Sequence, residues 1–281
     1  MKIKQFLVAC TLVFLTLSIN SCKKNDAADE FETTFELSGD QAIADNLTED
    51  ANDVMNEAAL DKNLMGTNGP VGPLGTTGIL TCATVTVTPL TGFPKTIVID
   101  FGVTGCTSLN GITRRGRINI ILTDSLRRPG SVATMTFENY YVNGYKKEGT
   151  ITWTNTSAPG SKSWNRTCTN GKITAPGGRY WLHSGTQDLV QTAGVATHLN
   201  LLDDVFSITG NCTVTNAAGR SRTATIINAL QKKTICANID MGTIKIQGPN
   251  HYAIIDFGNG TCDNLATISI DGRTPRTIIL R

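Results

Sequence analysis

A stretch of this sequence occurs twice, and the duplication constrains the fold more than any other feature of the chain. Residues 99–117 align without gaps on residues 255–273, and nine of the 19 positions carry the same residue. Composition alone would give roughly one or two matches, so a duplicated structural unit explains the agreement better. Each copy centres on Asp-Phe-Gly followed by a cysteine. We therefore expect two comparable units, over residues 82–122 and 236–281.

The chain around the two copies is typical of antiparallel β structure. It is rich in Thr, Ile, Val, Asn and Gly, and turn residues recur at short intervals without long helical periodicity. Residues 66–281 are enough to bury a full core. We predict one all-β domain, an antiparallel two-layer sandwich or open barrel of hairpin meanders, with one N-terminal helix. Two tandem domains are the weaker alternative, because nothing resembling residues 123–235 follows the second copy.

Each copy is interpreted as strand, hairpin, strand. The first copy has predicted strands over residues 83–89 and 96–101, and the second over residues 240–247 and 252–257. Pro275 must lie at a sheet edge or in a turn, because proline cannot donate a ladder hydrogen bond.

Between the copies, Asn143-Gly144 predicts a hairpin for which two registers compete. A two-residue turn pairs Val142 with Tyr145 and mixes polar with apolar residues on one face. A three-residue loop pairs Tyr141 with Tyr145 and gathers the apolar residues. That apolar face comprises Met135, Phe137, Tyr141, Tyr145, Ile151 and Trp153. We prefer the three-residue loop, because its apolar gain outweighs a few tenths of a kcal/mol of repulsion between two facing glutamates.

The first 21 residues have the layout of a bacterial secretory signal. A basic start and an apolar run of 14 residues, from Phe6 to Ile19, precede Ser21 and Cys22. Such a run is too short to cross a bilayer as a helix, which takes roughly 20 residues. The arrangement predicts cleavage before Cys22 and attachment of lipid to that cysteine. A soluble secretory signal is the alternative.

Acidic residues concentrate just after this signal. Residues 25–64 hold 12 acidic side chains and one basic, whereas residues 65–281 hold 20 basic and 11 acidic. We interpret residues 22–37 as an acidic tether. Residues 38–65 are predicted to form one helix that begins at a capping box and packs a narrow apolar edge on the β domain.

The basic residues of the β domain are interpreted as solvated strand faces, some of them covered by the acidic segment. Contact with anionic polysaccharide or lipid headgroups is the sharper alternative, and nucleic acid is not an expected partner. The densest basic stretch comprises Arg114, Arg115, Arg117, Arg127 and Arg128.

The Ser-Cys-Lys-Lys sequence at residues 21–24 resembles the signals of lipoproteins from Bacteroidota-type Gram-negative bacteria. With the paired Asp-Phe-Gly…Cys units and the Asn-Gly hairpin, the chain is similar to the β-rich, cysteine-containing lipoproteins of that group. The resemblance implies an outer-membrane lipoprotein, on the periplasmic or surface face, with acyl chains such as palmitate on Cys22. It implies no particular activity.

Six cysteines remain once Cys10, in the signal, and Cys22 are set aside. An even number in an exported chain predicts disulfides. A zinc site is disfavoured, because no Cys-x-x-Cys pair occurs and the chain has only three histidines. The predicted bridges are Cys82–Cys106 and Cys236–Cys262, from the duplication, and Cys168–Cys212, by elimination.

No catalytic, metal or cofactor signature stands out. The Asp-Phe-Gly motifs at Asp100 and Asp256 lack the other kinase motifs and predict structural turns. Calcium ligands near Asp256 lack the EF-hand spacing, and the histidines fit no hydrolase motif. Weak candidates for calcium ligands are Asp256, Asn259 and Asp263, and for paired glycosidase carboxylates Asp188, Asp203 and Asp204.

Aromatic side chains are the better functional candidates, because planar rings exposed on a sheet can stack on sugars. The candidates are Trp153, Trp164, Trp181 and Tyr180; the alternative is that they fill the core. We expect a non-enzymatic envelope lipoprotein that binds or scaffolds, with a glycan or anionic envelope component as its ligand. A polysaccharide-acting hydrolase and a subunit of a surface complex, with an unidentified protein partner, are the alternatives.

Overall fold

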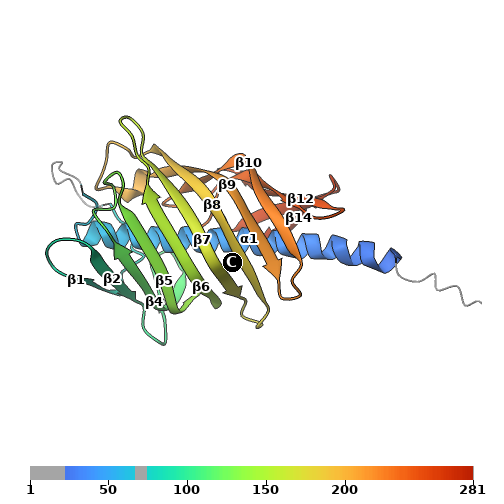
Figure 1. Cartoon of the computed structure of the whole chain (residues 1–281), viewed down its shortest axis with the longest axis horizontal. Helices are drawn as coiled ribbons and strands as arrows, with labels where there is room; N and C mark the ends of the chain where they lie inside the picture. The colour runs from blue at the N-terminus through green and yellow to red at the C-terminus, as the bar shows by residue number, and fades with distance from the viewer. Residues whose placement is uncertain (1–22, 67–74, 281) are drawn as a thin grey trace, which may run out of the picture.

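A computed structural model describes residues 23–66 and 75–280. These residues form one long helix, a short 3-10 turn and 14 strands (Figure 1). The elements are α1 (Lys23–Asp61), β1 (Thr84–Thr88), β2 (Lys95–Asp100), β3 (Cys106–Thr107), β4 (Thr113–Leu122), β5 (Val132–Val142), β6 (Tyr145–Asn155), β7 (Ser163–Thr174), β8 (Tyr180–Ala193), η1 (Leu201–Asp203), β9 (Val205–Asn216), β10 (Ser221–Lys233), β11 (Met241–Gln247), β12 (Tyr252–Asn259), β13 (Leu265–Ile270) and β14 (Arg276–Ile279).

All the strands belong to one antiparallel sheet. Each pairs with the next along the chain, except that the short β3 pairs only with β4 and leaves β2 and β4 as neighbours. β1 and β14 are the two outer strands, so within the described residues the sheet stays open. The predicted all-β antiparallel architecture is confirmed in its open form. One curved sheet replaces the two layers of a sandwich (Figure 1).

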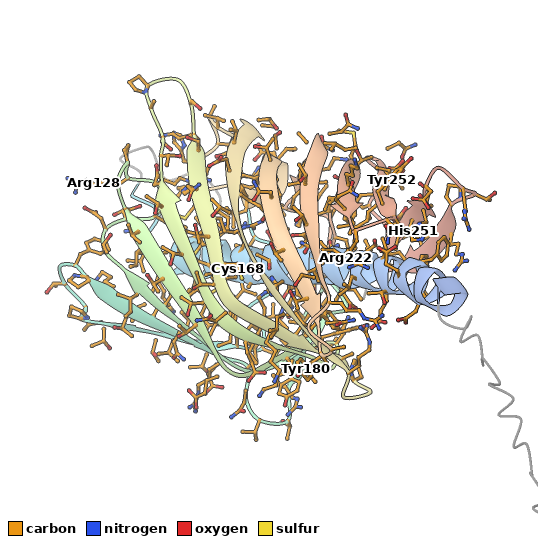
Figure 2. The ribbon with its side chains drawn as sticks, turned by 45° about the vertical axis from the view of Figure 1, so that its right-hand side comes forward. Arg128, Cys168, Tyr180, Arg222, His251 and Tyr252 are labelled. Atoms are coloured by element: carbon orange, nitrogen blue, oxygen red, sulfur yellow. A yellow bond between two sulfur atoms is a disulfide. The ribbon has the colours of Figure 1, made fainter. Side chains whose placement is uncertain are left out.

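Helix α1 lies in the concave side of this sheet, and the strands cross it along most of its length (Figures 1 and 2). From Leu37 to Leu60 every helix residue is buried, apart from three that are half-buried. The predicted packing through one narrow apolar edge is therefore wrong, because the helix is surrounded on all sides. The helix also begins at Lys23, so residues 23–37 are helical where the sequence suggested a tether.

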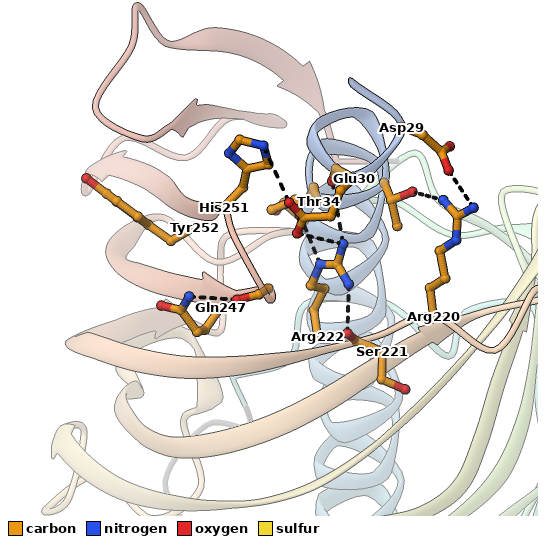
Figure 3. A network of polar contacts seen from close by, with 12 residues as sticks. Asp29, Glu30, Thr34, Arg220, Ser221, Arg222, Gln247, His251 and Tyr252 are labelled. Carbon is orange, nitrogen blue, oxygen red and sulfur yellow. Dashed lines mark hydrogen bonds and ion pairs between the residues drawn. The ribbon is translucent and has the colours of Figure 1, made fainter. Parts of the chain in front are cut away.

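Acidic residues of α1 pair with basic residues of the sheet. At the N-terminal end, Asp29 pairs with Arg220 at 2.5 Å and Glu30 with Arg222 at 3.2 Å (Figure 3). Deeper along the helix both partners are buried, in the pairs Glu49–Arg166, Asp50–Arg114 and Asp53–Lys232. Removing two charges from water is costly unless each meets the other. These ion pairs between α1 and the sheet therefore balance part of the charge difference between the two segments of the sequence.

The two copies of the duplicated unit lie at opposite edges of the sheet. The first copy supplies β1 to β4 and the second β11 to β14. Their predicted disulfides, Cys82–Cys106 and Cys236–Cys262, are both confirmed. The remaining disulfide prediction is wrong.

Cys168 and Cys212 are free thiols on β7 and β9, separated by β8. Each lies opposite Gly185 of that central strand. Strands two apart are separated by roughly 9–10 Å, whereas disulfides join Cα atoms about 4.4–6.8 Å apart. The Cys168–Cys212 bridge was predicted by elimination, but the order of the strands keeps the two sulfur atoms too far apart to bond.

The β5–β6 hairpin combines the two competing registers. Met135 pairs with Ile151, as the three-residue loop requires, yet Val142 pairs with Tyr145 across a two-residue turn. A register shift between Thr136 and Tyr141 absorbs the difference. Both turn residues, Asn143 and Gly144, have positive φ, which suits the two-residue hairpin turn. As a result Tyr140, and not Tyr141, points into the core.

Cys22 and the predicted signal lie outside the described residues. Among the residues that are described, no helix combines the length and the apolar character that crossing a bilayer requires.

Candidate functional site

A pocket of about 380 Å³ lies beside α1, where loops close over the helix. Its size falls in the range of small-molecule sites, about 300–1,000 Å³. The lining comprises Asp50 and Asp53 from α1, Thr76, Thr77 and Ile79 before β1, Asn110 between β3 and β4, Leu202 in η1, and Thr234, Ile235, Cys236 and Ala237 between β10 and β11. We call this site the helix-side pocket.

Asp50 and Asp53 form the floor, because residues three apart on a helix share a face. The guanidinium of Arg114, on β4, donates two hydrogen bonds to the Asp50 carboxylate, at 2.9 and 2.5 Å. The Tyr140 hydroxyl donates a third, at 3.3 Å. These charge-assisted bonds fix the orientation of the Asp50 carboxylate and balance its charge.

The floor is also tied to one wall of the pocket. Another Arg114 nitrogen donates to Ser108 Oγ at 3.0 Å, and that hydroxyl donates to the Ile79 carbonyl at 2.6 Å. The position of Ile79 therefore depends on the ion pair beneath it.

Asp53 has a separate cation. Lys232 Nζ donates to Asp53 Oδ2 at 2.7 Å and also to the carbonyl of Cys236 at 2.7 Å. Burial raises the pKa of Asp53 to about 6, and the Lys232 ammonium limits this rise. Asp53 is thus held in place by a buried cation, as Asp50 is.

Side chains of α1 hold the loops in place. Glu57 accepts hydrogen bonds from the Thr77 backbone and hydroxyl, at 2.9 and 2.6 Å, and from the Leu80 N–H at 3.1 Å. On the other side, the Asn46 side chain accepts from the Ile239 N–H at 2.7 Å. The disulfide at Cys236 braces the same loop. The pocket is therefore preorganised by buried contacts.

The mouth differs in chemistry from the floor. Leu202 and Ile235 are 42% and 58% exposed there. Thr76, Thr77, Thr234 and Asn110 add uncharged polar side chains to the lining. Since each carboxylate already has a cation, the pocket suits a compact uncharged ligand that carries hydroxyl groups and one apolar face.

The aromatic residues singled out from the sequence do not form a platform. Trp153, Trp164 and Trp181 are only 4%, 6% and 0% exposed. Trp153 and Trp164 border a void of about 10 Å³, room for one water at most. The prediction of these three as ligand-binding residues is wrong, and they fill the core instead. Only Tyr180 is partly exposed, on the rim of the sheet beneath the Lys172 ammonium (Figure 2).

The other candidates have structural roles. Asp100 and Asp256 each accept a bond from the glycine two residues on, at 2.8 Å, as the predicted turns require. Asp188 bonds Asn165, Asp203 bonds Thr197, and Asp204 pairs with Arg127, so these three acids have separate partners. Among the described residues the one group with metal-ligand geometry is Cys236, Asp240 and Cys262, and its two cysteines are joined to each other.

Sequence reasoning missed the floor of the pocket. Neither Asp50 nor Asp53 was singled out from the sequence, and the one relevant signal is the charge imbalance between residues 25–64 and 65–281. Comparison with protein-family models, with curated proteins and with solved structures finds no match for this chain.

Proposed function

We propose that this chain is a lipid-anchored, non-enzymatic binding protein of the cell envelope. In this proposal the helix-side pocket holds a compact uncharged polyol, such as one sugar unit of an envelope glycan. The observation that carries it is the floor of the pocket, where two buried carboxylates are each neutralised by a buried cation. Carboxylates held in this way accept strong hydrogen bonds from ligand hydroxyls without demanding a cationic ligand.

The mouth supports the same ligand class. Leu202 and Ile235 can cover the apolar face of a sugar ring, while Thr76 and Thr234 offer hydroxyls at its edge. A few convergent polar groups in a largely preformed pocket are typical of small-molecule sites. The envelope location and the lipid on Cys22 rest on the signal sequence alone.

A thermal-shift screen tests the proposal. The probes are neutral mono- and disaccharides, together with the matched amino sugars and uronic acids. We expect at least one neutral sugar to raise the melting temperature, and the charged analogues to have less effect. Ile235→Lys should abolish the shift, because the lysine occupies the mouth. Ile279→Lys, the same substitution at an exposed position of β14, should retain it. A complete panel without any shift would overturn the proposed ligand class.

Hydrolysis of a glycan is the second candidate, favoured by two carboxylates in one pocket. A pKa of about 6 suits Asp53 to act as a general acid. Against it, each carboxylate is held in an ion pair with a buried cation, which opposes the proton transfer that hydrolysis requires. Reducing-end release from glycans, with Asp53→Asn as the control, separates the two. Turnover that this variant abolishes would indicate an enzyme, whereas binding without turnover supports the first proposal.

A further inference from the structure

Strand β1 leaves one edge of the sheet open. Its residues Thr84–Thr88 pair with β2 on one side only, and within the described residues no strand pairs with the other side (Figure 1). Such an edge presents unpaired N–H and C=O groups, which can form a ladder with another strand.

The second copy of the duplicated unit shows what such an edge accepts. Thr84 lies opposite Asp100 in the first copy, as Thr243 lies opposite Asp256 in the second, so β1 and β11 are equivalent strands. The edge of β11 that corresponds to the open edge of β1 is paired antiparallel with β10. One copy therefore has an antiparallel neighbour where the other has none.

The sequence of β1 is suited to pairing with itself. Thr-Val-Thr-Val-Thr reads the same in both directions and contains no charge or proline. Natural edge strands are usually protected by charges, prolines or bulges. The opposite edge follows this rule, since the charged Arg276 begins β14. Two antiparallel copies of β1 centred on Thr86 would place threonine against threonine and valine against valine, pairings that stabilise a sheet.

Exposed apolar side chains also occur in the first copy of the unit. The three most exposed large apolar residues of the described chain are Leu90, Val103 and Leu109, at 90%, 88% and 79%. All three belong to the first copy, and Leu90 lies in the loop that follows β1. Leu90 thus places an exposed apolar side chain beside one end of the open strand, as interaction surfaces often do.

We propose that the chain forms a two-fold symmetric dimer through β1. The two strands pair antiparallel, with Thr86 of one copy opposite Thr86 of the other, and the two sheets become one. A symmetric contact of this kind uses the same patch on both copies and closes on itself. The partner that fits the open edge is thus a second copy of this chain.

Cysteine scanning tests the register. The full-length Thr86→Cys chain, oxidised mildly in membranes, should give a disulfide-linked dimer, because facing Cα atoms lie about 4.5–5.5 Å apart. Thr84→Cys is the matched control. In the proposed register Thr84 faces Thr88, and the two copies of residue 84 lie roughly 13 Å apart along the strand. Thr84→Cys alone should not crosslink, whereas mixing it with Thr88→Cys should.

A charged residue at position 86, on the proposed two-fold axis, tests whether the dimer forms through β1. By native mass spectrometry in detergent, the unmodified chain should appear at twice the monomer mass. Thr86→Lys should give the monomer mass with an unchanged circular dichroism spectrum, since Thr86 is exposed. Thr277→Lys, on the opposite outer strand, should remain dimeric. A monomeric unmodified chain, a dimer that survives Thr86→Lys, or equal crosslinking of Thr84→Cys and Thr86→Cys would each overturn the proposal.

Discussion

The two copies of the duplicated unit agree closely up to the second cysteine and then diverge. In both, an aspartate accepts a 2.8 Å bond from the glycine of Asp-Phe-Gly, and the phenylalanine, Phe101 or Phe257, is buried. Beyond the cysteine, the core-facing Arg114 of the first copy corresponds to the buried Ile270 of the second. Short sequence motifs determine the local turns. The residue type at a core-facing position depends instead on the side chains that it packs against in the rest of the molecule.

The glycine of each copy shows the same divergence. Gly116 has φ of +81° and lies within β4, beside a register shift between Arg115 and Arg117. The equivalent Gly272 has φ of +71° and forms the turn between β13 and β14. One positive-φ residue thus serves as a bulge in one copy and as a hairpin turn in the other, depending on its neighbours.

Giving the first copy the core residue of the second should have the largest effect. Arg114→Ile leaves the Asp50 carboxylate buried without its cation, and we expect a loss of about 3–5 kcal/mol in the free energy of unfolding. Ile270→Val, in the other copy, should cost only about 1 kcal/mol. Urea unfolding measures both. The double variant Arg114→Ile/Asp50→Leu should recover part of the loss, and a purely additive result would argue against the pair.

Removing each disulfide compares the two braces. The bridges span 24 and 26 residues, so the chain-entropy account predicts nearly equal losses of about 3–4 kcal/mol for the two double serine variants. Of the four bridged cysteines, only Cys236 lines the helix-side pocket. We therefore expect the second double variant to alter ligand shifts as well, which the first should leave unchanged. Markedly unequal stability losses would show that native contacts, not loop length, dominate.

Alanine substitutions at the equivalent glycines Gly116 and Gly272 should destabilise the protein to different extents. A Cβ at Gly116 would lie 2.0 Å from the Asn139 carbonyl oxygen, whereas at Gly272 the nearest atom is 3.8 Å away. Gly272→Ala should cost about 1–2 kcal/mol for its backbone conformation, and Gly116→Ala about 3 kcal/mol or more through the added clash. Thermal unfolding measures the difference. Equal losses would mean that the strand yields at Gly116.

The turn aspartates should show the smallest difference. Asp100→Ala and Asp256→Ala each remove one bond to a backbone N–H, worth about 1 kcal/mol. Asp100 also accepts a 2.8 Å bond from Arg117, which lowers the pKa of Asp100. That added stability is present above the unfolded pKa and disappears as the pH falls through the folded value. Asp100→Ala should therefore be the less stable variant at pH 7, and the difference should vanish in strong acid or high salt.

Sequence patterns predicted the strands, the two repeated bridges and the Asp-Phe-Gly turns, because each depends on residues close in the chain or on the duplication. The enclosure of α1 could not be predicted in this way. A sequence does not show whether an aspartate such as Asp50 is buried or exposed to solvent. The difference lies in the basic residue that pairs with the buried one, which is distant in the chain. Arg114 was recognised as basic, but its partner lies 64 residues away.

The candidate site was harder to predict than the fold. Its floor belongs to a helix and its walls to loops distant in sequence, so no local motif marks it. The three tryptophans were wrongly predicted to bind a ligand, because an indole ring is suited both to packing in a core and to stacking on a sugar. Cys168 and Cys212 illustrate a further limit, since counting cysteines carries no information on strand order.

The central position of α1 has a consequence for the order of folding. This segment is synthesised before the strands that enclose it, and Arg222, which bonds Thr34, follows that residue by 188 positions. The concave surface that encloses the helix exists only after the later strands have been made. Long-range closure of this kind slows folding and prolongs exposure of unfinished surfaces. A helix dense in carboxylates remains soluble during that wait, which an apolar one of the same length would not.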